Sequence, residues 1–129
     1  MRLNNFIFLI LITICFSGCR KTMMLVYWLM NKSQYDLAVE VNTHSKQFYT
    51  IASGGREVIA LENIKYWSKV ATSPRVYIKE LSVVNNQNVQ MKKNYRIDTN
   101  WEVQVSTPNN AFNARNSQSY ELHILDTDF

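Results

Sequence analysis

The sequence predicts an all-β fold, a single small antiparallel β-sandwich. Short segments that alternate apolar and polar residues recur along the chain, separated by turns rich in Asn, Ser, Gly and Pro. No long segment has the 3.6-residue spacing of an amphipathic helix. The chain has 129 residues, which is the size of one domain. An immunoglobulin-like strand order is suggested by analogy alone, since the paired cysteines of that family are absent, and a small open β-barrel is the alternative.

The first 18 residues have the layout of a secretory signal. The positive charge of Arg2 precedes an uncharged, apolar run from Phe6 to Phe16. This run of about 11 residues is shorter than the roughly 20 that a helix needs to cross the hydrocarbon core of a membrane. We therefore expect a removable signal and no permanent transmembrane span.

The end of this segment, Phe16-Ser17-Gly18-Cys19, resembles a lipobox, the processing motif of bacterial lipoproteins. The resemblance implies cleavage before Cys19 and a diacylglycerol on its thiol, although Phe16 stands where the motif most often has Leu. An ordinary secretory signal with a cysteine near the cleavage point is the alternative. Of the two cysteines, Cys15 lies in the removed segment, so Cys19 has no partner for an internal disulfide.

These motifs predict the domain organisation. Residues 1–18 are expected to be a removed lipoprotein signal peptide, residues 19–22 a lipid-anchored N-terminus, and residues 23–129 the β-sandwich domain. The first expected strand is the apolar run Met23 to Met30, for which a second contact with lipid is the alternative. In a strand, Tyr27 and Trp28 lie on opposite faces, so at least one of them must meet a partner or an interface.

The following elements are expected from the same patterns. Residues 37–42 alternate in the manner of a half-buried strand. Residues 46–61 are expected to form a hairpin whose turn contains Gly54 and Gly55, because glycine accepts positive φ at low cost. A loop is expected over residues 62–75, since Pro74 ends any helix there. Further strands are expected within residues 76–84, 89–92, 95–106, where Trp101 is expected in the core, and 120–125.

No catalytic or metal-binding motif is found, and we expect neither an enzyme nor a cofactor. There is no G-x-S-x-G elbow. His44 and His123 do not have the close spacing that directs two imidazoles at one metal ion, so surface histidines are expected and no metal site. The net charge of +4 is too small and too scattered to indicate nucleic-acid binding.

One loop motif, Lys65-Tyr66-Trp67-Ser68-Lys69, is a candidate ligand-binding site. Tyr66 and Trp67 on a loop could stack on a sugar or anchor a protein contact, since Tyr and Trp are frequent at binding hot spots. The alternative is that both side chains complete the core, because large aromatics supply much of the buried area of a small domain.

The lipobox, the Asn31-Lys32-Ser33 turn and the closing segment 120–129 (YELHILDTDF) together resemble small lipoproteins of Bacteroidetes. The resemblance implies a cell-envelope protein held in a membrane through acylated Cys19. Surface-displayed members have acidic residues after the cysteine, whereas Arg20 and Lys21 are basic here, which suggests an outer-membrane anchor facing the periplasm. We expect a non-enzymatic binding or assembly module for an envelope protein or glycan. The alternative is a structural subunit of an envelope complex that makes its contact through Met23 to Met30 or a strand edge.

Overall fold

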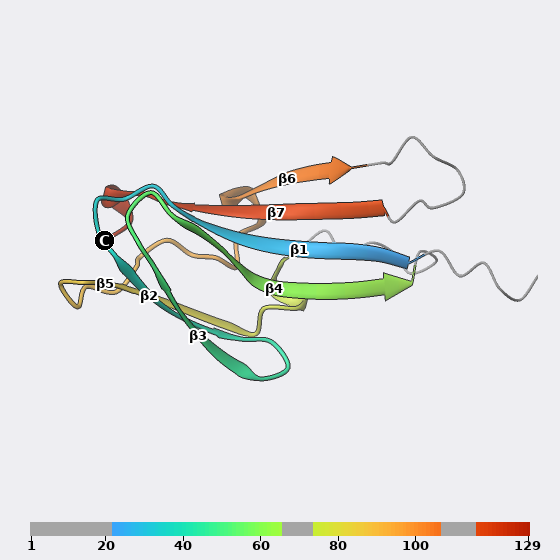
Figure 1. Ribbon diagram of the computed structural model, residues 1–129, viewed down its shortest axis with the longest axis horizontal. Coiled ribbons are helices and arrows are strands. Elements are labelled where there is room, and N and C mark those ends of the chain that lie inside the picture. The colour runs from blue at the N-terminus through green and yellow to red at the C-terminus, as the bar shows by residue number, and fades with distance from the viewer. Residues whose placement is uncertain (1–21, 66–73, 107–115) are drawn as a thin grey trace, which may run out of the picture.

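Two β-sheets packed face to face make up the protein (Figure 1). The computed structural model describes residues 22–65, 74–106 and 116–129. The four-stranded sheet has the order β4-β1-β7-β6 and the three-stranded sheet the order β3-β2-β5. The strands are β1 (Thr22–Asn31), β2 (Leu37–Asn42), β3 (Lys46–Ile51), β4 (Arg56–Lys65), β5 (Glu80–Asn85), β6 (Trp101–Ser106) and β7 (Asn116–Ile124), and short 3-10 turns are η1 (Pro74–Val76), η2 (Asp98–Asn100) and η3 (Asp126–Asp128).

This architecture confirms the predicted all-β sandwich, and the two sheets do not close into the alternative barrel. One strand pair departs from the antiparallel expectation, because β1 pairs with β7 in parallel. The first strand is therefore central in its sheet, whereas in the constant-type immunoglobulin order it lies at an edge. The strand order is thus not that of an immunoglobulin constant domain.

The apolar run at the start of the domain forms β1, as predicted. β1 pairs with β4 on one side and with β7 on the other, so both sides of its backbone are hydrogen-bonded. Side chains alternate across the sheet, and Leu25, Tyr27 and Leu29 point into the core with no exposed surface. β2 shows the alternation that its sequence predicted, with Val39 and Val41 buried.

The predicted hairpin over residues 46–61 is wrong. β3 pairs with β2 and β4 pairs with β1, so the segment with Gly54 and Gly55 carries the chain from one sheet to the other. The connection from β1 to β2 makes the same crossing beside it, and the Asn31 amide N–H donates to the Gly55 carbonyl over 2.9 Å. The hairpin turn instead lies at residues 43–45, between β2 and β3.

Asn31 joins these two crossings through its side chain, which is 1% exposed. Its Nδ2 donates to the carbonyls of Tyr35, Ile51 and Ala52 at 2.7, 3.1 and 3.0 Å. Its Oδ1 accepts from the Ser33 amide at 3.1 Å and from the Ser33 hydroxyl at 2.7 Å. A buried polar side chain with this many partners fixes where the chain passes between the sheets.

Between β4 and β7 the boundaries differ from the expected ones. The expected strand over residues 76–84 begins only at Glu80, because the Pro74 carbonyl accepts from the amides of Tyr77 and Ile78 and holds a turn there. The expected strand at 89–92 is reduced to a single bridge between Val84 and Gln90. β6 begins at Trp101, which is 5% exposed and lies in the core as predicted.

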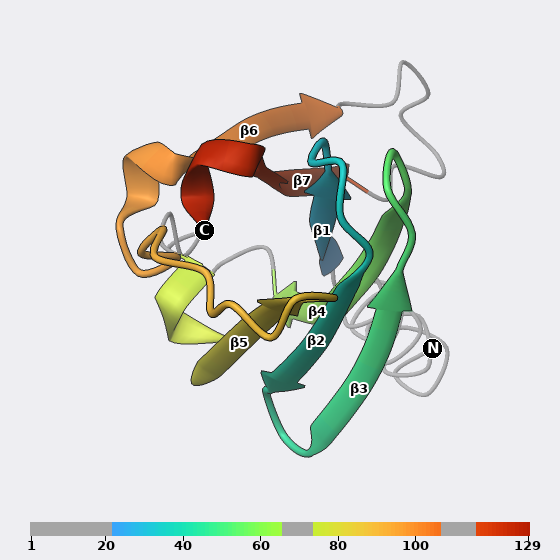
Figure 2. The same cartoon turned by 90° about the vertical axis from the view of Figure 1, so that its left-hand side faces the viewer.

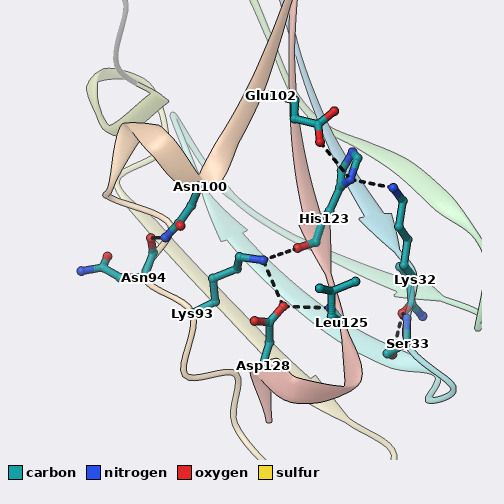
Figure 3. Close-up of polar contacts among 10 residues, drawn as sticks. Lys32, Ser33, Lys93, Asn94, Asn100, Glu102, His123, Leu125 and Asp128 are labelled. Atoms are coloured by element: carbon teal, nitrogen blue, oxygen red, sulfur yellow. Dashed lines mark hydrogen bonds and ion pairs between the residues drawn. The ribbon is translucent and has the colours of Figure 1, made fainter.

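The C-terminal residues close the side of the sandwich between β5 and β6. Residues 86–100 and η3 lie between the two sheet edges (Figure 2). Lys93 Nζ donates to the His123 carbonyl at 2.7 Å and pairs with Asp128 at 3.1 Å, and Asp128 also accepts from the Leu125 amide at 2.8 Å (Figure 3). These contacts hold the last turn against the end of β7.

Candidate functional site

The outer surface of β1 is apolar. Residues that alternate with the buried ones point away from the core, and Met24 among them is 36% exposed. Two β4 residues extend this surface, since Val58 lies opposite Trp28 and Leu61, 58% exposed, lies opposite Val26. We call this surface the β1–β4 patch, and it consists of Met24, Val26, Trp28, Met30, Val58 and Leu61.

A strand that is apolar on both faces is typical of a strand that is covered on both faces. A sheet with one face in water alternates instead, as β2 does, where Glu40 and Asn42 point outward between the buried valines. β1 has the first pattern, but its outer side chains remain partly exposed in the described residues. The sequence of β1 is therefore that of a strand whose outer face is covered by something else.

Arg56 lies at one end of the β1–β4 patch. Its guanidinium carbon is 5.0 Å from the centre of the Trp28 ring, a cation–π distance. No carboxylate of the described residues forms an ion pair with Arg56. Trp and Arg are among the side chains most enriched at binding hot spots, and here the two are in contact at the surface.

The other border of the patch is polar and comes from β7 and β6. Glu121 and His123 are the β7 partners of Trp28 and Met30. The His123 ring lies between two carboxylates: Nε2 is 3.2 Å from Glu121 Oε2 and Nδ1 is 3.5 Å from Glu102 Oε1. The Lys32 ammonium lies 2.8 Å from the same Nδ1, and Figure 3 shows Lys32 and Glu102 directed at this ring.

The residues proposed from sequence fall in different places. Cys19, Tyr66 and Trp67 lie outside the described residues. His44 is a surface histidine as predicted, with a side chain 81% exposed and 2.8 Å from Glu62. His123 is on the outer face as predicted, but its side chain is only 18% exposed.

Sequence reasoning missed the grouping around His123. Glu121 precedes His123 by two residues on the same strand, but Glu102 comes from a neighbouring strand and Lys32 from the turn after β1, so no motif with short spacing contains the whole group. The signal for the β1–β4 patch was present in the unbroken apolar run of β1, and the contribution of β4 depends on strand pairing.

The described residues contain no helix with the length and apolar character needed to span a membrane. Comparisons with protein-family models, with curated proteins and with solved structures gave no match for this chain.

Proposed function

We propose that this chain is a lipid-anchored, non-enzymatic docking protein of the bacterial cell envelope, which binds a protein partner on the β1–β4 patch. The observation that carries the proposal is the outer face of β1, whose sequence is that of a strand covered on both sides. Of the two functions expected from sequence, this geometry favours the structural or accessory subunit.

The chemistry of the patch favours a protein over a lipid surface. Glu102, which is 66% exposed, and Glu121 lie along its β7 and β6 border beside a single ammonium, that of Lys32, so this border has no excess of positive charge to attract an anionic headgroup layer. Arg56 at the other end has no ion pair among the described residues. The partner we propose has an apolar centre that covers Trp28 and a carboxylate that reaches Arg56.

The anchor is part of this proposal and rests on the lipobox resemblance at Cys19. Two residues, Arg20 and Lys21, separate Cys19 from Thr22, the first residue of β1, so the extended reach from Cys19 to Thr22 is about 10 Å. An acylated Cys19 would therefore keep β1 close to the membrane, on the periplasmic face of the outer membrane. A partner of this patch would be an envelope protein near that surface.

Site-specific photo-crosslinking in cells tests the patch. A photoreactive amino acid at Leu61 or at Met24 should give one and the same crosslinked protein from both positions. The matched control is Phe48, which is 72% exposed on the opposite sheet and should not give that product. Crosslinks to lipid alone, or the same product from Phe48, would contradict the proposal.

A charge on the patch gives a second readout. Leu61→Asp should abolish co-purification of the crosslinked partner after mild detergent extraction, because burying the charged aspartate in the interface carries a desolvation cost. Leu61 is 58% exposed, so the same change should alter the free energy of unfolding by less than about 1 kcal/mol. Phe48→Asp is the control with the same chemistry on the other sheet and should leave the complex intact.

A further inference from the structure

Two carboxylates lie directly opposite each other on the outer face of the four-stranded sheet. Glu102 of β6 and Glu121 of β7 are antiparallel partners, and like charges at such positions destabilise a sheet. Within the described part of the chain, no lysine or arginine forms an ion pair with either of them. A cation bound between these two carboxylates would offset their repulsion.

His123 completes a set of three metal-ligating side chains. It follows Glu121 by two residues, so both side chains lie on the same face of β7. One ligand atom from each of Glu102, Glu121 and His123 lies within 4.8 Å of the other two. Leu122 and Ile124, which flank His123, are fully buried and hold the strand in place.

The nitrogen Nδ1 of His123 already faces a positive group. The Lys32 ammonium is a donor only, so at 2.8 Å it donates to the Nδ1 lone pair. The proton of the neutral ring then lies on Nε2, which donates to Glu121 Oε2 at 3.2 Å. Lys32 comes directly after β1, and its amide donates to the Ile124 carbonyl at 2.8 Å, which fixes its backbone beside the histidine.

We propose that Glu102, Glu121 and His123 bind a divalent transition-metal ion of the Zn²⁺ type, and that the exposed ammonium of Lys32 occupies the cation position when no metal is bound. One imidazole and two carboxylates, with water completing the shell, match the ligand preferences of Zn²⁺. Ca²⁺ is expected to bind poorly, because it takes six to eight oxygen ligands and no imidazole.

Binding requires a small rearrangement that the exposures permit. Zn²⁺ takes nitrogen and carboxylate ligands at about 2.0–2.2 Å, closer together than the three atoms are here. Glu121, 19% exposed, contacts Nε2 on the opposite edge of the imidazole from the Lys32 ammonium at Nδ1, so its carboxylate must turn toward the metal. The Glu102 side chain, 66% exposed, is free to move inward while the Lys32 ammonium turns to solvent.

Zinc titration of the untagged full-length chain in detergent micelles tests the proposal. The chain has two histidines, so imidazole NMR signals can be assigned by comparing His44→Gln with His123→Gln. We expect one equivalent of Zn²⁺ to shift the ring signals of His123. His44 is the matched control, because it lies 2.8 Å from a single carboxylate, Glu62, and its signals should shift much less.

Calorimetry with variants gives the second arm. Glu102→Gln and Glu121→Gln should each weaken Zn²⁺ binding at least tenfold, and Lys32→Met should strengthen it severalfold by removing the competing ammonium. Glu102→Gln changes an exposed residue and should fold normally, so its loss of affinity reports on the ligand. An affinity unchanged in both glutamine variants, zinc bound at His44 instead, or displacement of Zn²⁺ by millimolar Ca²⁺ would overturn the proposal.

Discussion

Tyr27 and Tyr120 stack in the core, with ring centroids 4.9 Å apart and an interplanar angle of 11°. They are partners in the parallel pair of β1 and β7, so the register of that pair brings the two rings together. Trp101 adds an edge-to-face contact with Tyr27 at 6.1 Å. The centre of the four-stranded sheet is thus an aromatic cluster contributed by three strands.

The Tyr27 hydroxyl is buried and has no hydrogen-bond partner among the described residues. Tyr27→Phe removes this desolvated group and keeps the ring, so it should raise the free energy of unfolding by about 1 kcal/mol in denaturant titrations. Tyr95→Phe is the control and should lower the free energy of unfolding, because the Tyr95 hydroxyl donates to the Lys79 carbonyl at 3.1 Å. A Tyr27→Phe protein that is less stable than the parent would show that the hydroxyl has a partner.

Stability should fall in alkaline solution. Burial raises the pKa of Tyr27 well above its usual value, and the neighbouring Tyr120 adds to the effect; burial also raises the pKa of Tyr120 itself. In the unfolded chain a tyrosine loses its proton near pH 10, while the buried Tyr27 retains it. The stability that depends on protonated Tyr27 is therefore fully present below pH 10 and is lost as the pH rises further. Between pH 9 and 11.5, the free energy of unfolding from denaturant titrations should fall with increasing pH. This fall should be less steep in Tyr27→Phe, by up to about 1.4 kcal/mol per pH unit. Equal slopes in the two proteins would contradict the assignment.

Asn31 should be among the residues on which stability depends most. Asn31→Ala leaves the buried carbonyl of Ile51 without this donor and removes the acceptor for Ser33, so we expect a loss of about 3 kcal/mol in the free energy of unfolding. Asn63→Ala, on the exposed face of β4, is the matched control and should change the same quantity by less than about 0.5 kcal/mol. A loss below about 1 kcal/mol for Asn31→Ala would mean that the crossings do not need this side chain.

The second crossing can be tested at Gly55. A Cβ at this position would lie 2.9 Å from the Ala52 carbonyl oxygen, which also accepts from the Gly55 amide at 2.8 Å. Gly55→Ala should therefore lower the melting temperature. Gly54→Ala meets no atom within 4 Å, but Gly54 has a φ of 73°, so its cost should be about 1 kcal/mol from backbone strain alone. If Gly55→Ala proves harmless, the turn does not keep this geometry in solution.

Strand positions were predictable where the signal is local. The apolar run of β1, the alternation of β2 and the core position of Trp101 all follow from side-chain periodicity. Strand pairing was not predictable, because it depends on contacts far apart in sequence: β1 pairs with β7, and residues 46–61 divide between two sheets. Two adjacent glycines permit a hairpin and a crossing equally, so the turn residues do not distinguish them.

The candidate sites show the same division. The apolar outer face of β1 was visible in its sequence, and Val58 and Leu61 joined it only through the register of β4. His123 was correctly placed on an outer face, yet its carboxylate neighbour Glu102 comes from the opposing strand. A search for short spacings cannot find ligands that are brought together by a sheet.

The lipid anchor can be tested by the intact mass of the detergent-extracted protein. We expect a chain that begins at Cys19 and carries acyl groups, because residues 16–19 resemble a lipobox, whose cysteine thiol takes the diacylglycerol. Cys19→Ala should lose both the acyl mass and the cleavage before residue 19. Any membrane attachment that remains in this variant should not involve acyl groups. Cys15→Ala is the matched control, since this cysteine lies in the segment expected to be removed, and its mature mass should equal that of the parent. An unmodified mature chain that is extracted without detergent would contradict the anchor and leave Cys19, if it is retained, as a free thiol.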